Sequence, residues 1–88
     1  APFYALRLYP GDIGASTGFA TDARARVLDA QGRAIDGLYA VGNDMQSVMG
    51  GVYPAPGIAL GPGRVFAYIA ARDAAARAAA GASVRQAA

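Results

Sequence analysis

Short apolar segments separated by turn residues occupy the first half of the chain. Residues 3–9 (FYALRLY) alternate and are rich in aromatic side chains, which predicts a β-strand. Residues 38–41 (LYAV) form an apolar segment between glycines, a pattern typical of a buried strand. Shorter strands are predicted at residues 19–21, 25–28 and 33–35. The pattern therefore indicates several short strands before residue 42.

Two turn signals lie between these segments. Residues 29–32 (DAQG) have aspartate first and glycine fourth, which suits a type I turn with a bulge that closes a hairpin. Asp36-Gly37 predicts a second turn. The strands around them are expected to form a small antiparallel sheet.

One long helix is predicted at the end of the chain. Residues 63–80 consist mostly of strong helix formers. Asp73 and Arg77 lie one helical turn apart in the favourable order, so they can pair. Gly81 is a plausible C-cap, and residues 82–88 are expected to fray.

Two loops are unusually rich in small residues. Residues 11–18 (GDIGASTG) would allow the backbone to approach a neighbour closely. Residues 44–63 form a loop of a length that is usually functional or disordered, and its interspersed apolar residues argue against disorder. Pro62, near the end of this loop, suits the first turn of the helix, where its missing N–H costs nothing.

Length and charge narrow the function classes. The chain has 88 residues, enough for one small domain that would be marginal alone. No apolar run approaches the roughly 18 residues of a membrane span. The net charge is +2, and the arginines are dispersed, which argues against a nucleic-acid patch. The basic residues are expected to be solvated charges of the hairpin (Arg24, Arg26, Arg33) and of an exposed helix face (Arg64, Arg72, Arg77).

Two residue types that often carry chemistry are missing. Without cysteine there is neither a disulfide nor a thiolate metal site, which fits a reducing compartment and leads us to expect a cytoplasmic location. Without histidine the commonest metal ligand and general base are missing too, and no metal is expected. Chemistry must therefore use tyrosine, aspartate, arginine, backbone groups or a cofactor.

A family resemblance emerges from two long stretches. Residues 37–72, GLYAVGNDMQSVMGGVYPAPGIALGPGRVFAYIAAR, resemble the C-terminal segment of the FAD-dependent dehydrogenases that include 3-ketosteroid 1-dehydrogenases and fumarate reductase flavoproteins. Residues 2–43 are similar to the same family in the order of strand, glycine loop, hairpin and returning strand. Members are several hundred residues long, and their G-x-G-x-x-G fingerprint is absent here. The resemblance implies that residues 1–81 are the C-terminal segment of such an enzyme.

The loops favour one branch of this family. Residues 11–18 lack the histidine, and residues 53–62 the arginine, that fumarate reductases use for substrate carboxylates. The segment Tyr53-Pro54-Ala55-Pro56-Gly57 resembles the ketosteroid branch, with Ala55 where glycine is usual. Gly63 stands where that branch has alanine, Arg64 where it has methionine or leucine, and Val65 where it has threonine. The alternatives are a fragment similar to fumarate reductase or succinate dehydrogenase flavoproteins, and a non-enzymatic remnant or isolated domain without activity.

The resemblance implies two substrate-binding groups. The Tyr53 hydroxyl and the Gly57 N–H would hold the keto oxygen of a ketone or enone, because donors placed there stabilise developing negative charge. From the residues alone, Tyr53 is more often a half-buried loop aromatic and Gly57 a plain turn residue.

The resemblance also implies five cofactor-binding residues. Asn43 would bind the ribityl chain of FAD, and Gly42 would allow its close approach. The backbone of Ala59, Leu60 and Gly61 at the helix start would face the N1–C2=O edge of the flavin, where a helix N-terminus carries partial positive charge. A turn asparagine and ordinary helix capping are the structural alternatives.

We therefore expect an α+β chain, with a small antiparallel sheet and one long C-terminal helix, as a fragment of a larger FAD-binding (Rossmann-like) enzyme. The complete enzyme would hold FAD, whereas the fragment alone is expected to hold none and to be inactive. Its expected partners are the remainder of the enzyme and a ketone or enone substrate. Exposed apolar surface left by a missing partner could drive self-association.

Overall fold

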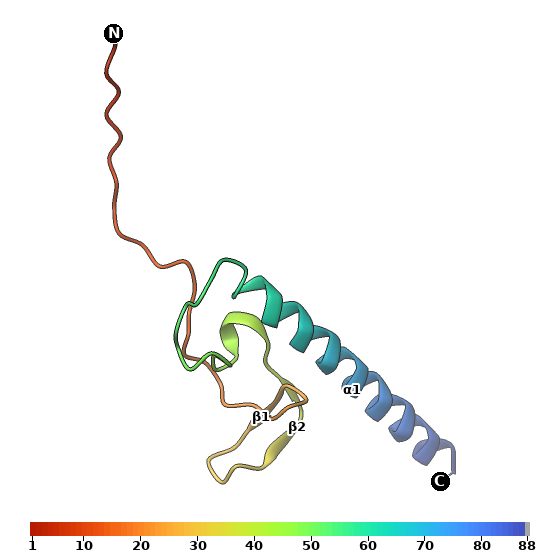
Figure 1. Cartoon of the computed structure of the whole chain (residues 1–88). Helices are drawn as coiled ribbons and strands as arrows, with labels where there is room; N and C mark the ends of the chain where they lie inside the picture. Colours follow the sequence, from red (N-terminus) through yellow and green to blue (C-terminus); the bar gives the residue numbers. More distant parts are fainter. Residues whose placement is uncertain (88) are drawn as a thin grey trace.

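The computed structural model describes residues 1–87 and, within them, the side chains of residues 1–82. Its elements are β1 (Arg26–Leu28), β2 (Ala34–Tyr39), the 3-10 helix η1 (Gly42–Asp44) and α1 (Leu60–Ala87). The hairpin of β1 and β2 and the short η1 lie along one side of α1, while the first residues run away from them as an extended segment (Figure 1). The small antiparallel sheet and the long helix confirm the coarse fold expected from the sequence.

The hairpin turn forms where the sequence predicts it. Asp29 donates its N–H to the Arg33 carbonyl at 2.8 Å, and its side chain accepts hydrogen bonds from the N–H groups of Gln31 and Arg33, both at 2.9 Å. Gly32 has φ +78°, a conformation that glycine adopts without steric cost. Aspartate first and glycine fourth thus define the turn, as expected.

The predicted turn at Asp36-Gly37 is wrong. Both residues lie inside β2, whose pairing with β1 shifts register between the partners Arg26↔Tyr39 and Leu28↔Ala34. Gly37 has φ +75°, so the extra residues form an irregularity within the strand instead of a chain reversal. The buried strand expected at residues 38–41 is only partly buried, because Leu38 keeps 45% of its surface exposed.

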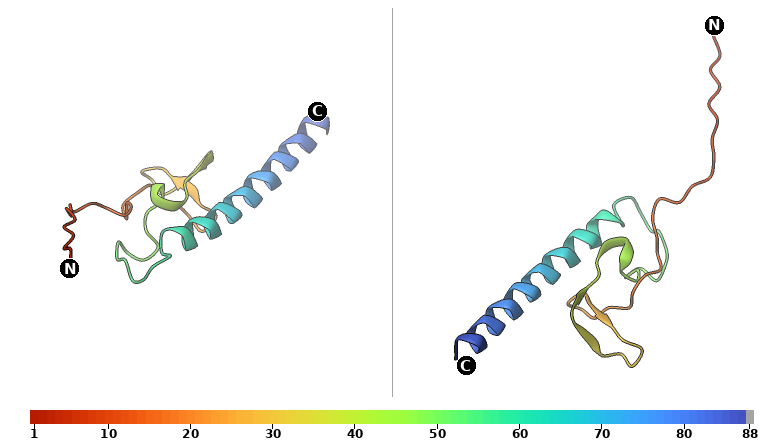
Figure 2. Two further views of the ribbon diagram at one scale, coloured as in Figure 1. Left: turned by 90° about the horizontal axis from the view of Figure 1, so that it is seen from above. Right: turned by 180° about the vertical axis from the view of Figure 1, so that it is seen from behind.

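The strands predicted before the hairpin do not form as such. Residues 3–9 are assigned to no strand, and Phe3 is 98% exposed, because nothing within residues 1–87 pairs with this segment. Residues 19–21 contribute only single bridges, Phe19 with Met45 and Thr21 with Val27. Both views in Figure 2 show the N-terminal segment standing apart from the folded part.

The long helix exceeds its predicted bounds at both ends. It begins at Leu60, where the Gly61 N–H donates to the Gly57 carbonyl at 2.7 Å, so Pro62 is its third residue. Gly81 is not a C-cap, because the alanine-rich sequence continues the helix to Ala87 and a glycine inside a helix costs only about 1 kcal/mol. Fraying of residues 82–88 stays a prediction, and Ala88 lies outside the described residues.

The buried core is small. It comprises Ala25, Val27, Ala40, Met45 and Ala70, and no large side chain among the described residues is fully buried. The radius of gyration is 19.1 Å, whereas a compact domain of this length would have about 12 Å. Most apolar side chains therefore face outward. No helix in the described part of the chain combines the length and apolar character needed to cross a membrane.

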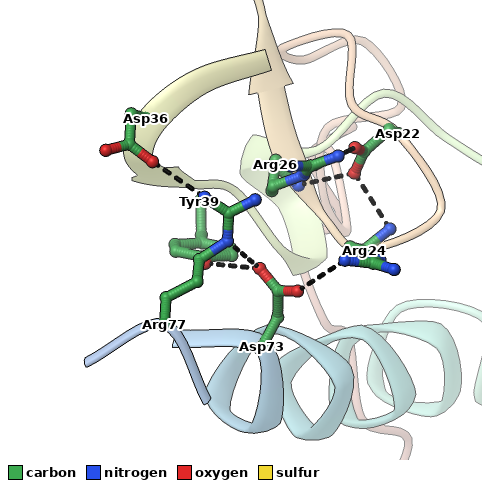
Figure 3. A network of polar contacts seen from close by, with 7 residues as sticks. All are labelled: Asp22, Arg24, Arg26, Asp36, Tyr39, Asp73 and Arg77. Atoms are coloured by element: carbon green, nitrogen blue, oxygen red, sulfur yellow. Dashed lines mark hydrogen bonds and ion pairs between the residues drawn. The ribbon is translucent and has the colours of Figure 1, made fainter. Parts of the chain in front are cut away.

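A polar cluster fastens the hairpin to α1 (Figure 3). The carboxylate of Asp73 accepts hydrogen bonds from Tyr39 Oη at 2.7 Å and Arg77 Nε at 2.8 Å, and Arg24 Nη1 lies 3.3 Å away. Arg77 also reaches Asp36 at 2.8 Å. We call these five residues the Asp73 clamp. The predicted Asp73–Arg77 pair is confirmed as one part of it.

The clamp shifts the pKa values of its members. The hydrogen bond from Tyr39, followed by that from Arg77, holds the pKa of Asp73 below its ordinary value of 3.8. The same bond to the Asp73 carboxylate raises the pKa of Tyr39 above 10.0. Charged aspartate and neutral tyrosine are thus the forms that the folded chain favours.

Candidate functional site

The candidate site is a hollow where the two small-residue loops meet the start of α1. Its volume is about 390 Å³, and most of its wall consists of apolar side chains and glycine. Asp12 is the one charged residue in this wall among the described residues. The larger apolar side chains that line it are Ile13, Met45, Val48, Met49, Val52, Ile58 and Phe66.

Backbone hydrogen bonds hold Phe19 and the end of the glycine loop (residues 11–18) against residues 44–47. The Phe19 N–H donates to the Asp44 carbonyl at 2.8 Å, and the Ser47 N–H donates to the Ser16 carbonyl at 3.2 Å. A Cβ at Gly18 would lie 2.4 Å from the Asp44 carbonyl oxygen, so only glycine fits there. The glycine loop therefore forms one wall of the hollow.

Close backbone approach also places Asn43. A Cβ at Gly63, in the first turn of α1, would lie 3.4 Å from Gly42 Cα, so the helix start packs directly on η1. A Cβ at Gly14 would lie 3.0 Å from Asn43 Nδ2, so the glycine loop reaches the Asn43 side chain from the other side. Asn43 thus lies between the loop and the helix, in the wall of the hollow.

The two predicted substrate-binding residues are placed differently. Tyr53 lines the hollow with 49% of its surface exposed. Gly57 is not part of the wall; it has φ +94°, and its carbonyl accepts the first bond of α1 from the Gly61 N–H. The hollow therefore brings Tyr53 but not Gly57 to its surface, and the role of both stays a prediction.

Three of the five predicted cofactor residues line two hollows. Gly42, Asn43 and Ala59 line the first hollow and also a second one of about 350 Å³. Leu60 lines the second hollow only, and Gly61 lines neither. The fold thus gathers four of these five residues beside the helix start, and their role in cofactor binding stays a prediction.

The polar groups at this place are available to a ligand. In the described part of the chain the Asn43 side chain makes no hydrogen bond. The N–H groups of Ala59 and Leu60 likewise donate to no acceptor among residues 1–87. An amide that both donates and accepts, beside open backbone donors, fits a hydroxylated chain and a polar ring edge such as FAD carries.

Sequence reasoning missed several wall residues. Phe66 lies one turn after Pro62 in the predicted helix, so its place beside the loop could have been inferred from helical spacing. Arg64 is exposed on the helix, as expected, but it also lines the second hollow, which the sequence did not indicate. Its only sequence signal is that it stands where the resembling branch has methionine or leucine.

Comparisons with known proteins identify the family of this chain. The family model described as "FAD binding domain" matches residues 1–60. The 3-oxosteroid 1-dehydrogenase of Comamonas testosteroni is 54% identical over 72 residues, 82% of this chain and 13% of that protein. The 4-oxocyclohexanecarboxylate 2-dehydrogenase of Sinomonas cyclohexanicum is 47% identical over 78 residues, 89% of this chain and 14% of that protein.

A solved structure shows the same fold. The crystal structure of 3-ketosteroid delta1-dehydrogenase from Sterolibacterium denitrificans, in complex with 1,4-androstadiene-3,17-dione, matches 68% of this chain with 50% sequence identity and a TM-score of 0.65. The match covers 11% of that protein, and the chain spans about 13% of the length of the first curated relative. Because the family model covers 60 of its 88 residues, this chain belongs to the FAD binding domain family.

Proposed function

We propose that this chain is the C-terminal part of an FAD-dependent dehydrogenase that oxidises a C–C bond beside a carbonyl, as a 3-ketosteroid 1-dehydrogenase does. One observation carries the proposal: Tyr53, Asn43 and the start of α1 share the wall of one mainly apolar hollow. The relatives named above, including a steroid dehydrogenase solved with a steroid dione, support the same reaction class.

Asn43, Gly42 and the backbone of residues 59–61 would hold the cofactor in the complete enzyme. Bound FAD would supply the hydride acceptor that no side chain of this chain can provide. The open N–H groups of Ala59 and Leu60 would donate to the polar edge of the flavin. The remaining FAD contacts, and the Rossmann-like domain that makes them, would come from the rest of the enzyme.

Tyr53 would bind the ketone. Its hydroxyl donates a hydrogen bond to the carbonyl oxygen, which stabilises the negative charge that develops when the neighbouring C–H bond is broken. The N–H of Gly57 is the second predicted donor. The base that accepts the proton would come from elsewhere in the enzyme, as the family resemblance implies.

The charge of the hollow favours a neutral substrate. Its described wall contains Asp12 and no basic residue, so a dicarboxylate would find no cation to pair with. The apolar side chains of the wall favour a bulky hydrophobic ketone instead. This argues against the alternative of a fumarate reductase-like fragment.

The remainder of the enzyme is the partner that we propose for the exposed apolar surface. Leu60, Val65 and Tyr68 of α1 are each more than half exposed, as are Phe3 and Leu8 in the extended segment. An in-frame G-x-G-x-x-G strand–helix unit upstream in the gene would support this partner, whereas its absence would favour a remnant.

Tyr53→Phe in the full-length enzyme tests the proposed function. Removing the hydroxyl should lower kcat by about 10²–10³-fold, the usual effect of losing one donor to a developing oxyanion. Tyr68→Phe is the matched control, because Tyr68 lies on α1 outside both hollows. Unchanged kcat in the Tyr53 variant would contradict the assignment.

The isolated chain should be colourless, and a yellow preparation would show that its FAD site is complete.

A further inference from the structure

The two hollows share part of their walls. Gly42, Asn43, Ala59 and Gly63 line both of them. The second hollow is completed by three residues from one face of α1, namely Leu60, Arg64 and Ala67. A ligand held by Asn43 and the helix start therefore has Arg64 as its nearest basic neighbour in the described part of the wall.

Five other arginines of the folded part, all with described side chains, already have partners. Arg72 lies over the Tyr68 ring, 5.8 Å from its centroid. Four more pair with aspartates, as Arg24–Asp73, Arg26–Asp22, Arg33–Asp29 and Arg77–Asp73.

Arg64 differs from all of these. No carboxylate of the described residues lies within 4 Å of it. Its helical neighbours three and four positions away are Leu60, Gly61, Ala67 and Tyr68, none of them acidic. The fold thus leaves an exposed guanidinium with no carboxylate partner among the described residues, beside a hollow whose other lining residues are uncharged.

We propose that Arg64 faces the bound FAD from the second hollow and stabilises its reduced state, so that this residue sets the reduction potential of the cofactor. This inference rests on the proposed function. In the proposed dehydrogenation the substrate loses a hydride and a proton. The hydride adds one negative charge to the cofactor, while the proton passes to the base elsewhere in the enzyme. A fixed cation beside the cofactor binds the more negative redox state more tightly, which raises the potential.

Arg64→Met in the full-length holoenzyme tests the inference. Methionine removes the charge and is a residue type that the resembling branch carries at this place, so the variant should fold. The potential is measured by equilibration with reference dyes, and FAD binding by fluorescence. We expect binding of reduced FAD to weaken about tenfold relative to oxidised FAD, which lowers the two-electron potential by ~30 mV.

Two further variants separate charge from packing. Arg64→Lys keeps the cation, so the reduction potential of the bound FAD should stay close to the wild-type value. Arg72→Met removes a guanidinium from α1 outside both hollows and should leave the potential unchanged. The inference is overturned if Arg64→Met binds FAD with the wild-type reduction potential. It is also overturned if Arg64→Lys lowers the potential as much as Arg64→Met does. A wild-type full-length protein that holds no FAD would overturn the proposed function itself.

Discussion

Single glycines decide how closely the parts of the candidate site approach one another. The sequence marks residues 11–18 as a loop that permits close approach, but it cannot say which glycine touches which neighbour. The structure assigns these contacts: Gly18 lies against the Asp44 backbone, and Gly63 lies against Gly42. Such contacts join residues far apart in the sequence, so no local pattern could have revealed them.

Gly18→Ala should destabilise the folded protein. Its new Cβ would lie 2.4 Å from the Asp44 carbonyl oxygen, a backbone atom that cannot move aside alone. Relieving this overlap lowers the free energy of unfolding by about 1–3 kcal/mol. Alanine also restricts the unfolded chain more than glycine does, which raises the free energy of unfolding by only about 0.4–1 kcal/mol. Gly11→Ala is the control, because nothing lies within 4 Å of its added Cβ. Thermal unfolding of the full-length enzyme measures both, and equal midpoints would contradict the close contact.

Asn43→Ala should weaken FAD binding. The Asn43 amide lines both hollows and makes no hydrogen bond within the described residues, so its groups are open to the cofactor. A hydrogen bond contributes about 0.5–1.5 kcal/mol, which corresponds to an increase in Kd of about two- to tenfold. Fluorescence titration of the full-length apoenzyme measures Kd. Gln31→Ala is the control, since Gln31 carries the same type of side-chain amide in the hairpin turn, outside both hollows. An unchanged Kd for Asn43→Ala would remove this residue from the cofactor site.

At the scale of elements, the Asp73 clamp joins the hairpin to α1. The sequence predicted the hairpin turn at residues 29–32 and the Asp73–Arg77 pair, since both depend on residues within four positions of each other. It missed the bonds to Asp73 from Tyr39 and Arg24, which lie 34 and 49 positions away. Only the packing of β2 and the Asp22–Arg26 segment on the helix brings these groups together. Local chemistry was therefore predictable here, and tertiary contacts were not.

The clamp should make stability depend on pH at both extremes. Because the folded pKa of Asp73 is below 3.8, its contribution is fully present above that value and is lost as the pH falls through the folded pKa. Because the folded pKa of Tyr39 is above 10.0, its contribution is fully present below that value and is lost as the pH rises through the folded pKa. Between these limits the clamp is intact.

Variants of the clamp test this pH window. Asp73→Asn should lower the unfolding midpoint near neutral pH and reduce its acid dependence, whereas Tyr39→Phe should reduce the alkaline dependence. Asp44→Asn is the control, because the Asp44 side chain makes no ion pair within the described residues. Thermal unfolding of the full-length enzyme from acid to alkaline pH measures all three. If the unfolding midpoint of Asp73→Asn fell at acid pH as much as that of the wild type, the clamp would not be the cause of the acid dependence of stability.

At the scale of the whole molecule, the chain lacks the partner that its sequence pattern requires. The alternating segment at residues 3–9 is extended, as predicted, but a strand also needs neighbouring backbone groups to bond with. Nothing within residues 1–87 supplies them, and the longest dimension reaches 79 Å. The strand predicted at residues 3–9 is therefore not formed by the described residues alone. The missing half of the sheet is expected in the rest of the enzyme.

Protease cleavage at Arg7 distinguishes a segment that pairs with the rest of the enzyme from one that stays free. In the isolated chain residues 3–9 have no backbone partner, so trypsin should cut after Arg7 before it cuts after Arg72 inside α1. In the full-length enzyme the same segment should be a paired strand, whose bonded backbone cannot enter a protease, and cleavage at Arg7 should become slow. Mass spectrometry of timed digests measures both rates. Equally rapid cleavage at Arg7 in the two proteins would show that this segment pairs with nothing, and that the apolar side chains of residues 3–9 remain exposed in the complete enzyme.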